Sequence, residues 1–261
     1  MLQTLPAEIT GLYRYPVKGL TPEALRSVPL RVGETLPADR RYAIENGPSG
    51  FDPKAPAWLS KTHFLMLQRD EWLAALQAHF DDATSVLTLK ENGATVADGN
   101  LETEAGRAAI ARFFASRHAD RIKGPPKVLV SPGHSFSDVA RKVVSIINLG
   151  SLAAIEDMVG APVHPLRFRG NILVRGWPAW HEASLLGETI AIGGVRLKVV
   201  KRITRCAAVN VDPELAVRDM EIPNTLMRRF GHNECGIYAE VIEGGEISVG
   251  DQIAVAQPAL V

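Results

Sequence analysis

The sequence predicts a mixed α/β, β-rich protein with two β-barrel-like modules and peripheral helices. Short β-type runs, broken by glycine and proline, fill both the N-terminal and the C-terminal parts of the chain. Only a few segments have the apolar periodicity of a helix. Of the 261 residues 46% are hydrophobic, which is enough for substantial buried cores. Small, strongly bent barrels accommodate such a density of short strands.

The N-terminal part begins with strands. β-type runs cover residues 9–15, 26–32 and 41–44. Residues 69–80 place Trp72, Leu73, Leu76 and Phe80 at helical spacing, which predicts a helix. Residues 85–89 and 94–97 flank Glu91-Asn92-Gly93 and predict a hairpin, and Thr103 can cap a helix running to about His118.

Gly124-Pro125-Pro126 ends this helical segment and is the best candidate linker. We therefore expect an N-terminal β-barrel module at 1–125 and a second domain at 126–261. In the second domain, helices are expected at 151–159 and 221–230, and hairpin turns at Gly193-Gly194 and Gly244-Gly245. The expected strands there are 143–148, 172–175, 189–192, 195–203, 236–242 and 252–255.

Composition excludes several classes of function. Lysine plus arginine equals aspartate plus glutamate at 29 each, so no overall charge attracts the protein to nucleic acid. No apolar run approaches the ~20 residues of a membrane-spanning helix, and residues 1–10 lack the organisation of a signal peptide. A cytoplasmic protein without a membrane-spanning segment is expected. Two cysteines are too few for a disulfide framework or a four-cysteine iron–sulfur cluster.

Cys206 is the first residue that could carry chemistry. It follows the predicted strand 195–203, and Arg202 and Arg205 lie close to it in sequence, where a cation would favour thiolate over thiol. One thiolate cannot hold a bare zinc or iron ion, so a metal at Cys206 would have to arrive already chelated. The alternative is a cysteine packed as a small hydrophobe, the commoner fate of an unpaired cysteine and the better interpretation of Cys235.

Two further clusters suggest an anion site. In Arg167-Phe168-Arg169-Gly170-Asn171, the arginines can bind phosphate with two hydrogen bonds each, and Gly170 lets the backbone approach closely. Lys18 stands in a turn broken by proline and glycine, followed later by Asp39-Arg40. The alternative is that these arginines and this lysine are ordinary solvated side chains. His181-Glu182 lacks the second histidine of a zinc-protease motif.

Taken together, the clusters resemble the MOSC family, named for the C-terminal domain of molybdenum cofactor sulfurase, preceded by its N-terminal β-barrel module. The resemblance covers about residues 9–255 and is closest to the mitochondrial amidoxime-reducing component and its bacterial relatives. The motifs that carry it are Tyr15-Pro16-Val17-Lys18-Gly19, Asp39-Arg40, Phe168-Arg169-Gly170-Asn171-Ile172, Arg205-Cys206, Val211-Asp212-Pro213 and Gly250-Asp251.

The resemblance implies a molybdenum cofactor (Mo-molybdopterin) with Cys206 as metal ligand, because the pterin then supplies the other sulfur ligands. It implies cationic cofactor contacts from Lys18, Arg40 and Arg169. Asn171, Arg205 and Gly19 would also line the site, although some relatives have serine where Gly19 stands. Asp212 would contribute a hydrogen bond or a water near the metal. The family is also associated with pyridoxal phosphate binding.

The implied activity is reduction of a small N-hydroxylated or related N-oxygenated compound. Some bacterial relatives carry a ferredoxin domain after the MOSC domain, but only ten residues follow Asp251. We therefore expect electrons from a separate flavoprotein, cytochrome or ferredoxin. The alternatives are a sulfur carrier, in which Cys206 forms a persulfide for metallocluster or cofactor sulfuration, and a non-catalytic holder of the cofactor.

Overall fold

The computed structural model describes residues 7–255. Its α-helices are α1 (Glu104–Arg117), α2 (Leu149–Val159), α3 (His181–Ser184) and α4 (Ile222–Phe230). Its strands are β1 (Ala7–Arg14), β2 (Glu23–Leu25), β3 (Ser27–Leu30), β4 (Tyr42–Ile44), β5 (Gln77–Asp81), β6 (Val86–Glu91), β7 (Ala94–Asn100), β8 (Val128–Val130), β9 (Val144–Asn148), β10 (Ile172–Arg175), β11 (Thr189–Ile192), β12 (Val195–Thr204), β13 (Glu234–Glu243), β14 (Gly245–Ser248) and β15 (Gln252–Val255). Short 3-10 helices are η1 (Lys61–His63), η2 (Glu71–Ala75), η3 (Ala119–Arg121), η4 (Pro165–Phe168) and η5 (Ala207–Asn210).

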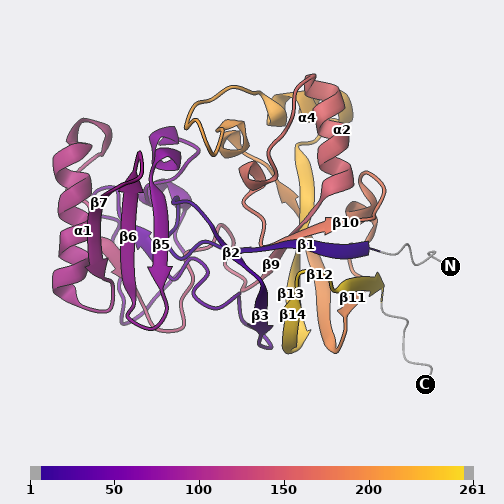
Figure 1. The fold of residues 1–261 in the computed structure, drawn as a ribbon, viewed down its shortest axis with the longest axis horizontal. Helices are drawn as coiled ribbons and strands as arrows, with labels where there is room; N and C mark the ends of the chain where they lie inside the picture. The colour runs from indigo at the N-terminus through magenta and orange to yellow at the C-terminus, as the bar shows by residue number, and fades with distance from the viewer. Residues whose placement is uncertain (1–6, 256–261) are drawn as a thin grey trace.

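Seven strands form a closed barrel in the order β10-β9-β13-β12-β11-β15-β1, and β1 pairs back to β10 (Figure 1). Alternate residues of β12 are buried over much of its length, as expected of a strand with one face towards a barrel core. The core contains Ile146, Val174, Leu197 and Ile237. The helices α2 and α4 lie together at one end of this barrel. The predicted mixed, β-rich α/β class is confirmed.

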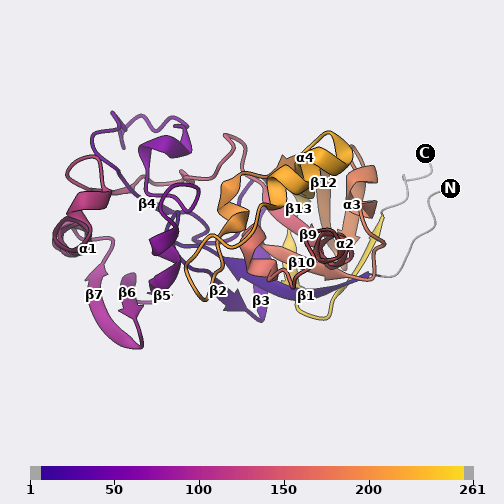
Figure 2. The ribbon, with the colours of Figure 1, turned by 90° about the horizontal axis from the view of Figure 1, so that it is seen from above.

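The strand β2 extends the barrel sheet by pairing with β1, and the other strands of residues 7–255 form small sheets beside the barrel rather than a second closed one. The three-stranded sheet β5-β6-β7 is covered by α1, and β4 pairs with β8 (Figures 1 and 2). This N-terminal unit has a core of its own, which includes Leu73, Phe80, Leu89 and Phe114. Its first predicted strand instead joins the barrel as β1, because antiparallel pairing with β10 and β15 satisfies both of its edges.

Many predicted elements are confirmed. The helix α1 begins after Thr103, whose side chain accepts a hydrogen bond from Gly106 N at 3.0 Å. The β6–β7 and β11–β12 hairpins form where expected. The predicted boundary at 125/126 stays a prediction, but the sheets cross it three times, since β1 lies in the C-terminal barrel, β3 pairs with β14 and β4 pairs with β8. Among the described residues, no helix has the length and apolar character that crossing a membrane requires.

Two predicted elements are wrong. Residues 69–80 do not form one helix but the short η2 followed by β5, whose Ala78 and Phe80 amides donate to Thr21 Oγ1 and Glu23. These tertiary bonds and the pairing with β6 outweigh the helical spacing. Gly244-Gly245 does not join a hairpin, because β14 pairs with β3. A Cβ on Gly244 would lie 2.7 Å from Leu30 O, so the glycine permits this close crossing.

Candidate functional site

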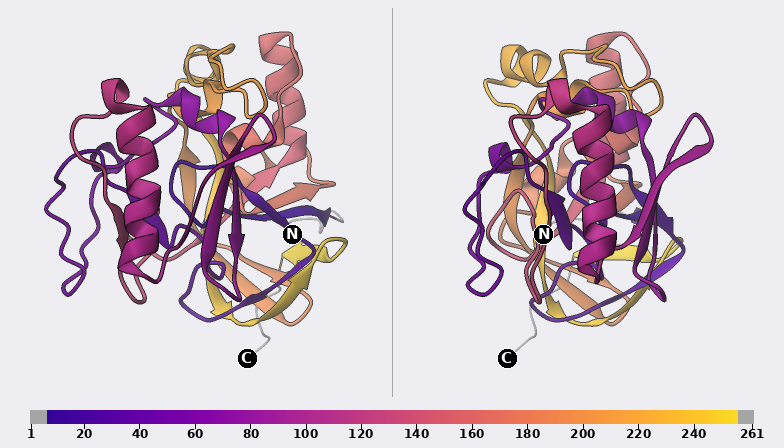
Figure 3. Two further views of the ribbon diagram at one scale, coloured as in Figure 1. Left: turned by 60° about the vertical axis from the view of Figure 1, so that its left-hand side comes forward. Right: turned by 90° about the vertical axis from the view of Figure 1, so that its left-hand side faces the viewer.

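A cleft of about 340 Å³ lies where the N-terminal unit meets the barrel. Figure 3 shows the N-terminal unit and the barrel from two further directions, and in its right view the N-terminal unit lies in front of the barrel. Segments far apart in the sequence line the cleft, and they bring together seven of the eight residues singled out from the sequence. These residues are Lys18, Gly19, Arg40, Arg169, Asn171, Arg205 and Cys206.

Cys206 is half-buried at the end of β12 and immediately precedes η5. Its position is fixed by the neighbouring Arg205, whose backbone N–H donates to Asn233 O at 2.9 Å. The Asn233 side-chain amide donates in return to Arg205 O at 2.7 Å. Paired bonds of this kind hold the chain in one direction as it leaves the barrel. Cys206 therefore lines the cleft next to a backbone segment that these hydrogen bonds hold in place.

The Arg205 side chain joins three segments around Cys206. Its Nε donates to Cys235 O at 2.7 Å and its Nη1 to Phe168 O at 2.8 Å. Its Nη2 is buried without a hydrogen-bond partner among residues 7–255. Arg202 does not join it, because Arg202 donates to Ala183 O at 3.1 Å and lines a separate pocket. The expectation that both arginines serve Cys206 is therefore wrong for Arg202.

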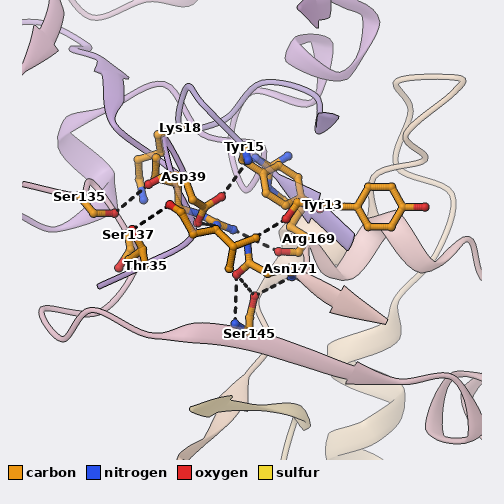
Figure 4. A network of polar contacts seen from close by, with 12 residues as sticks. Tyr13, Tyr15, Lys18, Thr35, Asp39, Ser135, Ser137, Ser145, Arg169 and Asn171 are labelled. Carbon is orange, nitrogen blue, oxygen red and sulfur yellow. Dashed lines mark hydrogen bonds and ion pairs between the residues drawn. The ribbon is translucent and has the colours of Figure 1, made fainter. Parts of the chain in front are cut away.

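Two arginines share the ring of Tyr15, near the centre of the network in Figure 4. The guanidinium carbon of Arg169 lies 4.2 Å from the ring centroid and that of Arg40 lies 4.7 Å from it. Arg40 pairs with Asp39 and donates to Arg169 O at 3.1 Å. Asp39 in turn accepts from Tyr15 N at 2.8 Å, so the acid positions both the ring and one of the two cations.

Arg169 differs from Arg40 in having no counter-ion. Within residues 7–255 its guanidinium forms no hydrogen bond or ion pair. Burial lowers the pKa of Arg169 to about 10, and the charge of Arg40 adds to this effect. Burial acts on Arg40 in the same sense and is the largest single influence, but the charge of Asp39 together with Tyr15 and Asp138 raises the pKa of that arginine overall. Of these two arginines, Arg40 is thus neutralised and Arg169 lacks an anion.

Lys18 is buried and paired with Asp138, and its Nζ also donates to Phe136 O at 2.9 Å. Burial lowers the pKa of Lys18, although Asp138 opposes the shift. The next residue, Gly19, has a φ of +87°, and a Cβ there would lie 2.8 Å from Leu65 O. A side chain at this position would be strained, so only backbone of Gly19 can face a ligand.

Asn171 serves the barrel itself. Its Oδ1 accepts from Ser145 N at 3.0 Å and from Ser145 Oγ at 2.7 Å, and its Nδ2 donates to Tyr13 O at 3.1 Å (Figure 4). These bonds join β1, β9 and β10 beside the cleft. Gly170 is a packing residue, because a Cβ there would lie 2.3 Å from Ile147 Cγ1. This contact gives a structural reason for the glycine between the arginine and the asparagine.

Asp212 is the one residue that does not line the cleft. Its Oδ2 pairs with Arg167 Nη2 at 2.6 Å, and its Oδ1 accepts from the amides of Glu214 and Leu215 at 2.8 Å each. Arg167 also pairs with Asp219 at 2.7 Å. Of Arg167 and Arg169, it is therefore Arg167 whose guanidinium pairs with the carboxylates that follow η5. The expected role of Asp212 near a metal has no support in these contacts.

Sequence reasoning missed several cleft residues. Asp138, Lys61, Lys201 and Tyr238 all line the cleft, and none stands in a motif that could have revealed it. Cys235 is buried as predicted, and burial raises the pKa of its thiol to about 12. No group of three or more His, Cys, Asp and Glu side chains in the described part of the chain could hold a metal ion. A metal at Cys206 would therefore need ligands from outside the protein.

Comparisons with known proteins identify a domain family in the C-terminal part of the chain. A profile of the MOSC domain matches residues 126–254. Among solved structures, the chain is similar to the YuaD protein from Bacillus subtilis, with 16% identity, 98% of each chain covered and a TM-score of 0.48. It is also similar to YiiM from Geobacillus stearothermophilus, with 18% identity, 45% of this chain and 55% of that chain covered, and a TM-score of 0.35. No curated protein matches the chain. Residues 126–254 are therefore a MOSC domain.

Proposed function

We propose that the cleft binds a molybdenum cofactor through the Cys206 thiolate and reduces N-hydroxylated or related N-oxygenated compounds. The observation that carries this proposal is the uncompensated guanidinium of Arg169 in the same cleft as Cys206. A cation held in a protein interior without a counter-ion is costly, and an anionic ligand removes that cost. A phosphate-bearing cofactor with soft ligands of its own meets both the arginine and the lone thiolate.

The residues present fit such a group. Arg169 would take the phosphate with two parallel hydrogen bonds, while Lys18 and Arg40, which are paired with Asp138 and Asp39, would offer further N–H donors. Asp39 and the Tyr15 ring hold the arginines in place, so little side-chain entropy is lost on binding. Arg205 would keep Cys206 directed into the cleft through its two carbonyl contacts.

The bound cofactor would supply the two-electron chemistry, and the protein would supply ligation, orientation and charge. In the overall reaction the N–O bond breaks and the oxygen leaves as water, with two electrons and two protons consumed. The electrons would come from a separate flavoprotein, cytochrome or ferredoxin. Tyr15 would stay neutral during turnover, since burial raises its pKa to about 12, and would act only as a support for the arginines.

The experiment is elemental analysis with pterin fluorescence on protein made in a host that synthesises the cofactor. We expect near-stoichiometric molybdenum and pterin in the wild type and in Cys235→Ala, and loss of both in Cys206→Ser. Molybdenum retained by Cys206→Ser with an unchanged electronic spectrum would refute the ligand assignment.

Other outcomes identify the alternatives. Absence of metal and pterin together with a persulfide on Cys206 would point to a sulfur carrier. Bound cofactor without turnover with any donor would point to a holder. Bound pyridoxal phosphate would be identified by its own absorption band, and pterin fluorescence would then be absent.

A further inference from the structure

The cleft carries more positive charge than one cofactor phosphate requires. The protein as a whole has a formal net charge of zero, yet seven cationic and only two anionic side chains line this cleft. Three of the cations are neutralised by carboxylates: Lys18 by Asp138, Arg40 by Asp39, and Arg167 by Asp212 and Asp219. The Arg205 side chain is engaged with two backbone carbonyls.

Three cations of the cleft then remain without a carboxylate: Arg169, Lys61 and Lys201. Arg169 is assigned above to the cofactor. Within residues 7–255, neither the Lys61 nor the Lys201 amine makes a hydrogen bond or an ion pair. Lys201 is exposed and Lys61 is half-buried, so both lie at the open margin of the cleft. They come from opposite units, Lys61 from η1 and Lys201 from β12.

Tyr238 lines the cleft together with both lysines. It stands opposite Lys201 in the ladder between β12 and β13, and the charges of Arg205, Arg40 and, more weakly, Lys61 act on it. Burial, followed by the charge of Asp138, raises the pKa of Tyr238, so its hydroxyl stays protonated. The hydroxyl has no hydrogen-bond partner among the described residues, although it belongs to a cleft-lining side chain. A neutral O–H beside two ammonium groups is a donor set for an anion.

This donor set is separated from Cys206 along the barrel. Ile203 and Lys201 lie on β12, which ends at Thr204 shortly before Cys206, and both line the cleft. An extended chain rises ~3.3 Å per residue, so Lys201 and Cys206 lie at different places along the cleft, farther apart than a hydrogen bond could span. A substrate whose N–O group meets the cofactor held by Cys206 could therefore place a second group near the lysines.

We propose that Lys61, Lys201 and Tyr238 form an anion subsite that selects substrates carrying a carboxylate or phosphate beside the reducible N–O group. This inference rests on the proposed function, since it names the substrate class of that reductase. Asp138 lies nearby but is paired with Lys18, which limits its repulsion of an incoming anion.

The test compares two amidoximes that differ by one charge, benzamidoxime and 4-carboxybenzamidoxime. The KM of each is measured with the holoenzyme and reduced methyl viologen as electron donor. Binding of each to the oxidised holoenzyme is measured separately by calorimetry, which does not depend on turnover. The double variant Lys61→Ala/Lys201→Ala is matched by Lys54→Ala/Lys90→Ala, which removes two exposed lysines that do not line the cleft.

We expect wild type to bind the carboxylated probe more tightly, and the cleft double variant to weaken that binding about fivefold to tenfold, since exposed ion pairs are individually modest. Benzamidoxime should be unaffected, as should both probes in the control variant. Tyr238→Phe should weaken only the carboxylated probe. Equal affinity of wild type for the two probes, or loss of molybdenum from the cleft variant, would overturn the inference. If wild type binds the carboxylated probe selectively but reduces neither probe, the proposed reductase activity is refuted and the anion subsite is supported.

Discussion

Arg169→Met should stabilise the cofactor-free protein while removing its affinity for phosphate. Burial lowers the pKa of Arg169 from 12.5 to about 10, which corresponds to roughly 3 kcal/mol against the charged form in the folded state. Because the folded-state pKa is the lower one, this cost is fully present below pH 10 and fades only as the pH rises towards 12.5. Methionine keeps an unbranched side chain against Tyr15 but carries no charge.

The gain is reduced by the lost cation–π contact with Tyr15, which is worth about 0.5–2 kcal/mol. We therefore expect the cofactor-free variant to be more stable by about 1–2 kcal/mol in urea denaturation, or by roughly 2–4 °C in Tm for each kcal/mol. Inorganic phosphate should raise the Tm of wild type but not that of the variant.

Arg31→Met is the matched control, because Arg31 is an exposed arginine away from the cleft. It should leave both the stability and the response to phosphate unchanged. If Arg169→Met instead destabilised the cofactor-free protein by more than about 1 kcal/mol, Arg169 would be a structural residue and the argument from its missing counter-ion would fail.

Three further predictions concern a close backbone contact of α1, the ion pairs of Arg167 and the reactivity of the two cysteines. Gly106→Ala lies in a helix, where alanine normally stabilises, but a Cβ there would lie 2.0 Å from Asn100 O, so urea denaturation should show a loss of about 2 kcal/mol or more. Arg167→Met removes a buried cation that pairs with the half-buried Asp212 and the exposed Asp219, and the same assay should show a loss of about 2 kcal/mol, whereas an unchanged midpoint would contradict this role. In cofactor-free protein at pH 8, iodoacetamide should alkylate Cys206 and spare Cys235, whose pKa is raised by burial to about 12; peptide mass spectrometry showing the reverse order would be inconsistent with the structure.

Local sequence signals predicted much of the fold. The Thr103 cap, the Asn92-Gly93 and Gly193-Gly194 turns and the apolar strands of the barrel each depend on neighbouring residues. The helix expected at 69–80 failed because its apolar residues bury equally well in η2 and β5. The pairing of β5 with β6 and the bonds from Thr21 and Glu23 decide between them, and these contacts are not local.

The closure of the barrel could not be predicted for the same reason. The strand β1 reaches β10 and β15 across most of the chain, and no local pattern records that pairing. The residues of the site also fall into two groups, those that local motifs identify and those that only tertiary contacts reveal. Motifs identified the cleft residues that stand in family-like patterns, such as Lys18, Arg169 and Cys206. Lys61 and Tyr238 stand in no sequence motif, and only the three-dimensional structure shows that they line the cleft between the two units.

The central claim is that Cys206 binds molybdenum in this cleft. X-ray absorption at the molybdenum edge of the purified holoprotein tests it most directly, because it counts the sulfur neighbours of the metal. We predict one fewer sulfur neighbour in whatever molybdenum Cys206→Ser retains than in wild type, with no change in Cys235→Ala. An identical sulfur shell in wild type and Cys206→Ser, at equal metal occupancy, would contradict the assignment.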